Sequence, residues 1–214
     1  MKIFLDTANV DAIEKYSFLI EGVTTNPSLL SKEIESPITS LLKILSLVDG
    51  DVSIEVNGTQ CEEIIRESIH ISSLGNNAVV KIPMTLEGLK AVRLLKTSKA
   101  TSKIRVNITL VFSLSQALLA ALAGADFVSI FVGRLDDNGI DGMDVVREIR
   151  TIFDSHNIKT KIITASVRNL EHVTRAASYN SDIVTISPKT FEEMYTHDLT
   201  DLGLKKFQND TNKK

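Results

Sequence analysis

Eight short runs rich in β-branched and other apolar residues recur along this 214-residue chain, and segments long enough for a helix separate most of them. They cover residues 3–6, 22–25, 52–56, 78–83, 104–109, 127–132, 161–166 and 183–187. The runs are apolar almost throughout, which is typical of parallel strands covered on both faces. Eight strand and helix units favour a closed barrel, because side chains just fill the interior of eight strands.

The sequence therefore predicts an α/β fold, a (β/α)8 TIM barrel forming a single domain over residues 1–214, with residues 199–214 as a C-terminal helix and tail. A doubly wound open sheet is the alternative. Neither G-x-G-x-x-G nor G-x-x-x-x-G-K-[ST] occurs in the chain, so the commonest functional reason for an open sheet is missing.

Apolar residues between the runs recur at helical spacing. One stripe comprises Leu114, Ala117, Leu118, Ala121 and Leu122, and a second comprises Val145, Ile149, Ile152 and Phe153. Asn9 and Ser113 stand where they can cap the helices that begin near Val10 and Leu114.

Charge and cysteine content exclude several function classes. The net charge of −3 gives no global field for nucleic acid or an anionic membrane. One cysteine and four scattered histidines rule out a disulfide framework and a Cys/His metal cluster. Cys61 precedes two glutamates, which would raise the pKa of its thiol, and the histidines are expected on the solvated surface. We therefore expect no metal. We also expect a soluble cytoplasmic protein, because no run approaches the ~18 apolar residues of a membrane span.

Polar residues interrupt seven of the eight runs toward their C-terminal ends. They are Asp6, Asn26, Glu55 with Asn57, Lys81, Asn107 with Thr109, Ser129, and Ser166. In a parallel barrel these ends converge on the face where catalytic groups lie. Strand periodicity predicts that three pairs each share a side of their strand. The pairs are Asn107 with Thr109, Ser129 with Phe131, and Thr164 with Ser166.

Lys81 is the most informative of these residues. It stands within the apolar run Val79–Pro83, where an unpaired buried ammonium would cost several kcal/mol. Desolvation favours the neutral amine, which can attack a carbonyl to give a Schiff base. The alternatives are a structural ion pair with a carboxylate and a side chain that extends to solvent from the strand end.

Asp6 and Glu55 are candidate acid/base partners, since Schiff-base chemistry and carbon–carbon cleavage both move protons. Asp6 follows an apolar strand, and Glu55 lies between Ile54 and Val56, so both are expected in low dielectric. Asp6 could instead cap the following helix.

Arg134 and Arg168 are candidate anion-binding residues. Each follows a strand end, and Ser166 adds a hydroxyl donor. Two guanidinium groups and a hydroxyl can bind a phosphate in an otherwise acidic protein.

The chain resembles small transaldolases of the Schiff-base-forming group that also includes fructose-6-phosphate aldolase. The resemblance runs from Met1 to about Phe207. It is carried by FLDTA from Phe4, GVTTNPS from Gly22, VKIP from Val80, NITLVFS from Asn107 and FVGR from Phe131.

The resemblance implies a role for each candidate residue. Lys81 matches the Schiff-base lysine, Asp6 the acid/base for carbon–carbon cleavage, and Glu55 with Thr109 the pair that positions a catalytic water. The residues implied to bind the substrate are Asn26, Asn107 and Ser129 for the dihydroxyacetone unit, Phe131 beside it, and Arg134, Ser166 and Arg168 for the phosphate. No metal or organic cofactor is implied.

Two positions favour transaldolase within this group. Fructose-6-phosphate aldolases carry glutamine where Glu55 stands and tyrosine where Phe131 stands. Phe131 offers no proton to the three-carbon intermediate, which then waits for an aldose acceptor. The expected reaction moves dihydroxyacetone from sedoheptulose 7-phosphate or fructose 6-phosphate to glyceraldehyde 3-phosphate or erythrose 4-phosphate.

The alternatives are an aldolase that releases dihydroxyacetone and a phosphosugar-binding barrel without turnover. The resemblance also implies a ring-like homo-oligomer, a pentamer or decamer, in which a helix over about Leu199–Asn209 reaches a neighbour. In that helix Leu202, Leu204 and Phe207 could supply an apolar contact.

Overall fold

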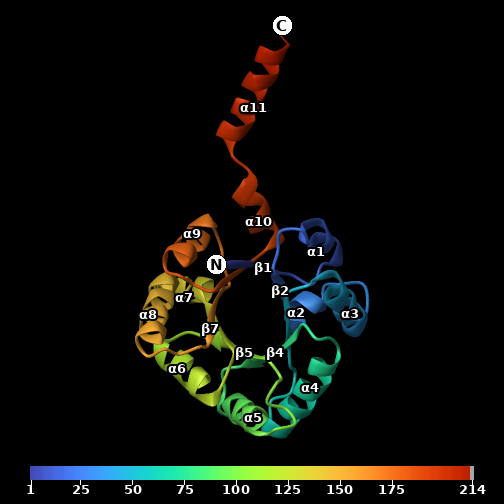
Figure 1. The fold of residues 1–214 in the computed structure, drawn as a ribbon, viewed down its shortest axis with the longest axis vertical. Coiled ribbons are helices and arrows are strands. Elements are labelled where there is room, and N and C mark those ends of the chain that lie inside the picture. The colour runs from blue at the N-terminus through green and yellow to red at the C-terminus, as the bar shows by residue number, and fades with distance from the viewer. Residues whose placement is uncertain (213–214) are drawn as a thin grey trace.

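The computed structural model describes residues 1–212 and confirms the predicted fold: eight parallel strands pair in chain order into one closed barrel, β1 to β8 (Figure 1). The strands are β1 (Lys2–Asp6), β2 (Gly22–Thr24), β3 (Asp51–Glu55), β4 (Ala78–Pro83), β5 (Val106–Val111), β6 (Phe127–Phe131), β7 (Lys161–Ala165) and β8 (Ile183–Ile186). Most predicted bounds hold within one residue. The fifth strand lies two residues later than predicted, because the backbone turns back from Ile104 to Thr101 before β5 begins.

Helices surround the barrel, and α11 projects away from it at the C-terminal end (Figure 1). They are α1 (Val10–Tyr16), α2 (Pro27–Leu30), α3 (Pro37–Leu47), α4 (Cys61–Ser73), α5 (Leu86–Thr97), α6 (Leu114–Ala123), α7 (Val132–Asp136), α8 (Gly142–Ser155), α9 (Leu170–Ser178), α10 (Pro188–Tyr195) and α11 (Asp198–Thr211). The predicted caps are confirmed: Asn9 accepts a hydrogen bond from the Ala12 N–H, and Ser113 accepts one from the Gln116 N–H.

The buried face of α6 differs from the predicted leucine stripe. Its buried side chains are Ala117, Ala120 and Ala123, whereas Leu122 is 76% exposed and Leu118 is at the surface. Alanine on the inner face lets the helix backbone lie close to the strands, so the larger leucines point outward. The second stripe holds in part, since Ile149 and Phe153 of α8 are fully buried.

The lumen of the barrel is divided into an apolar layer and a polar layer. The apolar layer is a separate cluster of Phe4, Val79, Phe127, Ile163 and Ile183. Side chains two residues apart on a strand share a side, so the next inward layer toward the C-terminal ends contains Asp6, Lys81, Ser129, Ala165 and Thr185. The apolar cluster thus closes the barrel beneath a group of polar side chains.

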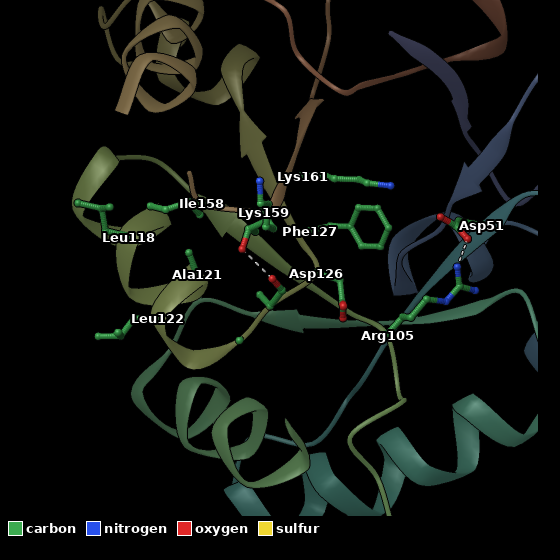
Figure 2. Close-up of a pocket in the computed structure, with 13 residues that line it drawn as sticks. Asp51, Arg105, Leu118, Ala121, Leu122, Asp126, Phe127, Ile158, Lys159 and Lys161 are labelled. Atoms are coloured by element: carbon green, nitrogen blue, oxygen red, sulfur yellow. Dashed lines mark hydrogen bonds and ion pairs between the residues drawn. The ribbon is translucent and has the colours of Figure 1, made fainter. Parts of the chain in front are cut away.

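A cavity of about 830 Å³ lies at the opposite, N-terminal end of the strands (Figure 2). Leu118, Leu122 and Phe127 line it together with charged residues. Its acidic side chains are engaged, because Asp51 pairs with Arg105, and Asp126 pairs with Lys96 and accepts the Val106 N–H. Size alone therefore does not identify the site of chemistry. None of the helices in residues 1–212 is long and apolar enough to cross a membrane.

Candidate active site

A second cavity, about 260 Å³, opens at the C-terminal ends of the strands and gathers most of the predicted site residues. It is lined by Asp6, Asn26, Lys81, Ser129, Phe131, Arg134, Ser166 and Arg168, together with Thr24, Ala165, Val167 and Thr185. The remaining predicted residues, Glu55, Asn107 and Thr109, lie on β3 and β5, the strands that flank Lys81 on β4. These residues come from eight separate segments of the chain and converge on one mouth of the barrel.

Lys81 is 3% exposed, so its ammonium does not extend to solvent. Its Nζ lies 3.0 Å from Glu55 Oε2 and donates a hydrogen bond of 3.1 Å to the Thr25 carbonyl oxygen. The ion pair that the sequence left as an alternative is therefore present. Strand pairing places Glu55 directly beside Lys81, with both side chains on the inner side of the barrel. The charge on Lys81 is satisfied by another candidate site residue.

Asp6 is joined to a chain of hydroxyl groups. The Thr24 hydroxyl donates to Asp6 Oδ1 at 2.8 Å and lies 2.6 Å from the Thr185 hydroxyl. Because Thr24 has one hydroxyl hydrogen and gives it to Asp6, Thr185 must donate to Thr24. Asp6 does not cap the following helix, since Asn9 does so.

The pKa of Asp6 is raised above its ordinary value. Burial of the carboxyl in the barrel mouth is the main cause, and the nearby Glu55 charge adds to it. Lys81 and the Thr24 hydrogen bond act in the opposite direction and only partly offset burial. Part of the residue still faces the cavity, so Asp6 is a carboxyl that can exchange a proton with a bound molecule.

Asn107 and Ser129 form a second buried polar chain. The Ser129 hydroxyl donates to Asn107 Oδ1 at 2.9 Å, and Asn107 Nδ2 donates to the Ser53 hydroxyl at 3.2 Å. Asn107 is fully buried and pairs with Lys81 across the strands. This chain holds the Asn107 and Ser129 side chains in one orientation beside the lysine.

The Thr109 hydroxyl is fully buried, and no residue among 1–212 forms a hydrogen bond with it. A buried hydroxyl without a protein partner indicates a place for water or a substrate atom. The backbone of β5 is irregular here: the pairing with β6 shifts register after Ile108, and Leu110 has a φ of +58°. Such a conformation is costly for leucine and is typical of functional sites.

Asn26 caps a helix and also lines the cavity. Its Oδ1 accepts the Leu29 N–H at 2.9 Å and caps the short helix α2, while the residue also lines the cavity. The amide nitrogen makes no hydrogen bond to another residue in the described chain and is available to donate into the cavity.

Phe131 lies between the lysine and one arginine. Its ring centroid is 5.9 Å from Lys81 Nζ and 5.4 Å from Arg134 Cζ. Arg134 stands on α7, directly after β6, and Arg168 follows β7. The two guanidinium groups line the same cavity as Ser166, so the structure brings the predicted anion-binding residues together.

The prediction that Thr164 and Ser166 share a side of their strand is wrong. The Thr164 hydroxyl donates to Ser181 at 2.9 Å, away from the cavity, whereas Ser166 lines it. Strand β7 ends at Ala165, and Ser166 has a φ of +57°. The alternation of strand side chains therefore stops before Ser166.

Gly133 allows the segments that carry the two arginines to approach each other. Its N–H donates to the Ser166 carbonyl oxygen at 3.1 Å. A Cβ at this position would overlap that oxygen and would lie 2.5 Å from Arg168 Nε.

We expect Gly133→Ala to lower the thermal midpoint and to weaken anion binding at the cavity, because the backbone and Arg168 must move apart. Overpacking of this kind costs about 1–3 kcal/mol, and each kcal/mol shifts the midpoint of a chain of this size by about 2–4 °C. Thermal melts with and without inorganic phosphate measure both effects. Gly203→Ala is the control, because a Cβ there meets no atom within 4 Å. Equal melting behaviour of the two variants would contradict this account of Gly133.

The expectation that all histidines lie on the solvated surface is wrong for His172. His70, His156 and His197 are exposed, but His172 is 7% exposed and contacts the segment of Arg168. Sequence reasoning also missed Thr24, Thr185 and Ser53, because threonine and serine inside strands resemble ordinary strand residues.

Cys61 is buried at the start of α4, and the pKa of its thiol is raised, chiefly by burial and further by Glu62 and Glu87. The direction agrees with the raised thiol pKa that the sequence predicts for Cys61. Across residues 1–212 no three His, Cys, Asp or Glu side chains stand close enough to hold a metal ion.

Comparison with known proteins agrees with these features. The family model described as Transaldolase/Fructose-6-phosphate aldolase matches residues 3–214. The chain is 51% identical over 215 residues to a probable transaldolase of Clostridium perfringens (strain SM101 / Type A), with 100% of this chain and 98% of the relative covered. It is 48% identical to a probable transaldolase of Thermodesulfovibrio yellowstonii, with 100% and 99% covered, and 46% identical to one of Nitrosopumilus maritimus, with 100% and 96% covered.

Among solved structures, a GMP reductase C318A of Trypanosoma brucei in complex with guanosine 5'-monophosphate is similar with a TM-score of 0.50 and 16% identity. The similarity covers 67% of this chain and 31% of that one, and it shows the fold alone. The family match over nearly the whole chain and relatives at about half identity lead to one conclusion: this chain is an enzyme of the transaldolase/fructose-6-phosphate aldolase family.

Proposed function

We propose that this enzyme is a transaldolase that moves a dihydroxyacetone unit from sedoheptulose 7-phosphate to glyceraldehyde 3-phosphate, giving erythrose 4-phosphate and fructose 6-phosphate in the pentose phosphate pathway. The observation that carries the proposal is Lys81, a lysine 3% exposed at the floor of a cavity that also holds two arginines and a carboxyl of raised pKa. A barrel that only bound sugar phosphates would have no reason to bury this lysine.

Glu55 is suited to prepare Lys81 for attack. Its Oε2, 3.0 Å from Nζ, can accept a proton from the ammonium and leave the neutral amine. The amine adds to the ketone carbon of the donor sugar, and the resulting carbinolamine loses water to form a protonated imine. The buried Thr109 hydroxyl, without a partner among the described residues, can hold the water that carries these protons.

Asp6 is suited to the cleavage step. Its carboxylate takes the proton of the C4 hydroxyl while the electron pair of the C3–C4 bond moves into the protonated imine, which becomes an enamine. The first aldose leaves. The enamine then attacks the aldehyde carbon of the acceptor, Asp6 returns its proton to the new alkoxide, and water hydrolyses the imine. The raised pKa of Asp6 suits a group that both takes and returns a proton.

The remaining side chains supply binding. Asn26, Asn107 and Ser129 can hydrogen-bond the hydroxyls of the dihydroxyacetone unit, since all three present amide or hydroxyl groups beside Lys81. Arg134, Arg168 and Ser166 can bind the phosphate with charge-assisted hydrogen bonds.

Phe131 favours transfer over release of free dihydroxyacetone. Its ring lies 5.9 Å from Lys81 Nζ and carries no acidic hydrogen, so it cannot protonate the enamine. The alternative activity, fructose-6-phosphate cleavage with release of dihydroxyacetone, needs that proton.

We expect Phe131→Tyr to increase the release of free dihydroxyacetone from fructose 6-phosphate by about tenfold or more, because a phenol would stand near the enamine. A coupled assay for dihydroxyacetone without acceptor measures this. Phe112→Tyr is the matched control, because Phe112 packs edge-on against Phe131 and does not line the cavity. Unchanged release by Phe131→Tyr would count against this explanation of specificity.

A transfer assay tests the proposed function directly. Purified enzyme is given fructose 6-phosphate and erythrose 4-phosphate, and sedoheptulose 7-phosphate is measured. The proposal expects product with acceptor and little dihydroxyacetone without it. Fast dihydroxyacetone release without acceptor would favour the aldolase instead, and no consumption of fructose 6-phosphate would reject both enzymes.

We further propose a cytoplasmic enzyme that forms a homo-oligomer, a pentamer or decamer. Sugar-phosphate substrates and the single unpaired cysteine support the location. Helix α11 supports assembly, because it has no buried residue and exposes Leu199, Leu202, Leu204 and Phe207. The molar mass in solution tests it.

A further inference from the structure

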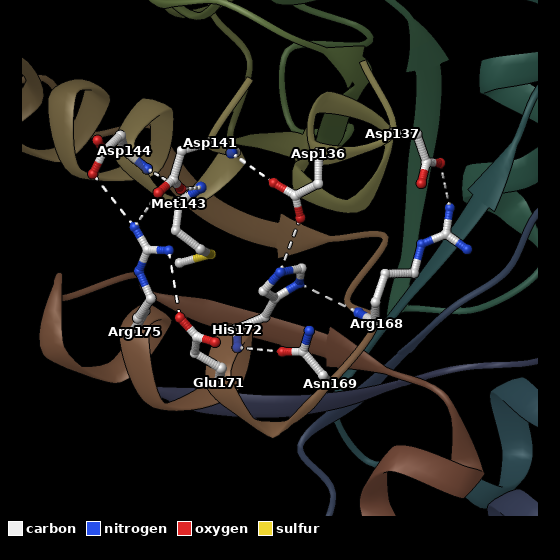
Figure 3. A network of polar contacts seen from close by, with 11 residues as sticks. Asp136, Asp137, Asp141, Met143, Asp144, Arg168, Asn169, Glu171, His172 and Arg175 are labelled. Atoms are coloured by element: carbon white, nitrogen blue, oxygen red, sulfur yellow. Dashed lines mark hydrogen bonds and ion pairs between the residues drawn. The ribbon is translucent and has the colours of Figure 1, made fainter. Parts of the chain in front are cut away.

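The segments that carry Arg134 and Arg168 are connected by a histidine outside the cavity (Figure 3). His172 stands on α9, four residues after Arg168, and its side chain is enclosed between α9 and α7. His172 Nε2 lies 3.0 Å from Asp136 Oδ2, and His172 Nδ1 lies 3.3 Å from the Arg168 backbone nitrogen, which donates to it.

These two contacts define the state of the imidazole. Because the Arg168 N–H donates to Nδ1, that nitrogen must be an acceptor without a hydrogen. The single hydrogen of the neutral ring is then on Nε2, where it is donated to Asp136. His172 therefore connects the two segments with one accepting and one donating nitrogen.

Asp136 fixes the other end of this connection. It is the last residue of α7, two residues after Arg134, and its Oδ1 accepts the Gly142 N–H at 2.9 Å from the start of α8. The Asn169 side chain caps α9 by accepting the His172 N–H at 2.9 Å. The backbone and the ring of His172 are thus both held.

The Arg168 segment needs such support. Ser166 stands in the left-handed region with a φ of +57°, so the chain leaves β7 in a conformation that costs energy. The Gly133 N–H holds the Ser166 carbonyl, and Asp137 holds the Arg168 guanidinium at 2.9 Å. Among these contacts His172 is the one that holds the Arg168 backbone itself.

We propose that His172 is a positioning residue for phosphate recognition: its Nδ1 holds the Arg168 backbone N–H from α9, so that Arg168 and Arg134 meet one phosphate group together. This inference rests on the proposed function, in which these arginines bind the substrate phosphate. His172 does not line the cavity.

Two variants separate the two contacts of the ring. In His172→Asn the amide oxygen takes the place of Nδ1 and can still accept from Arg168, but the donor to Asp136 is lost. In His172→Gln the amide nitrogen takes the place of Nε2 and can still donate to Asp136, but the acceptor for Arg168 is lost. Each variant therefore removes one hydrogen bond and retains one.

The measurement is transfer from fructose 6-phosphate to two acceptors, erythrose 4-phosphate and unphosphorylated erythrose. In His172→Gln we expect KM for the phosphorylated acceptor to rise about five- to tenfold with kcat nearly unchanged, the effect of one lost hydrogen bond. We expect kcat/KM for erythrose, at saturating donor, to stay constant. His172→Asn should remain within about twofold of wild type for both acceptors.

Binding of inorganic phosphate gives a readout that does not depend on turnover. Phosphate should raise the thermal midpoint of the wild type and of His172→Asn, and it should raise that of His172→Gln less. Arg175→Gln is the matched control, because Arg175 on α9 pairs with Asp141 and Asp144 and makes no contact with Arg168. It should melt earlier and retain the wild-type phosphate response.

The inference would be overturned if the Asn and Gln variants lost the same kcat/KM, or if one variant lost the same kcat/KM with both acceptors. His172 would then be a structural residue, and the proposed function would still stand. If the wild-type enzyme used both acceptors equally well, the cavity would not recognise the acceptor phosphate, and the inference would fail. Failure of the wild type to transfer from fructose 6-phosphate at all would reject the proposed function first.

Discussion

Replacing Lys81 with methionine is expected to lower the turnover of sugar phosphates by about 10⁴-fold or more, the effect of removing a covalent nucleophile. Methionine has an unbranched side chain of similar length and can fill the space of the buried lysine stem. Residual transfer should be at background in the coupled assay, and circular dichroism should show an intact barrel.

Two further variants make this result specific. Lys81→Arg keeps a positive charge beside Glu55 but cannot form an imine with a ketone, so it should be equally inactive. Lys96→Met removes another partly buried lysine, which is paired with Asp126 at 2.6 Å on the far side of the fold, and should be less stable with normal turnover. Substantial turnover by either Lys81 variant would mean that another group is the nucleophile.

Asp6→Asn is expected to lower turnover by about 10²- to 10⁴-fold, the range for a lost general acid/base, and to raise the thermal midpoint at neutral pH. The pKa of Asp6 is raised in the folded protein, so its ionised form costs folding free energy above that pKa. Below the ordinary carboxyl pKa, Asp6 is protonated in both the folded and the unfolded chain, and the difference between the variant and wild type should vanish. Melting curves from neutral to acid pH measure this.

The same pKa determines the acid limb of the pH–rate profile. If ionised Asp6 takes the proton, kcat/KM, which reports the free enzyme, should fall as pH decreases through a value above the ordinary pKa of an aspartate. Thr24→Val should move this limb to higher pH, because the Thr24 hydrogen bond favours the ionised form. Asp51→Asn is the control: it breaks the ion pair with Arg105 at the other end of the barrel and should lower stability with no change in the limb. Two results would contradict the role given to Asp6. One is an acid limb that does not move to higher pH in Thr24→Val, and the other is an Asp6→Asn variant that melts below wild type at neutral pH.

The barrel and the convergence of the polar residues could be predicted because both depend on patterns that repeat along the chain. Apolar runs alternate with helical segments, and the C-terminal ends of parallel strands meet at one mouth whatever the exact bounds of each strand. Lys81 stood out because a charge within an apolar run has few structural explanations. The FLDTA, NPS and VKIP motifs then supplied roles that spacing alone does not give.

Details that depend on close packing were not predictable in this way. The inner face of α6 consists of alanines because the helix lies near the strands, whereas the sequence favoured the larger leucines. Ser166 departs from strand alternation because its φ is positive, and the serine residue type does not predict that conformation. His172 is buried and its ring meets Asp136 at the end of α7, a contact that depends on the fold and not on the local sequence.

The central claim is that Lys81 forms a covalent imine with the donor sugar. Borohydride reduction of the enzyme in the presence of fructose 6-phosphate, followed by mass analysis of its peptides, tests this most directly. The account predicts one reduced three-carbon adduct, on the peptide that contains Lys81, and none in the Lys81→Met variant. An adduct on a different lysine, or no adduct while fructose 6-phosphate is being consumed, would contradict it.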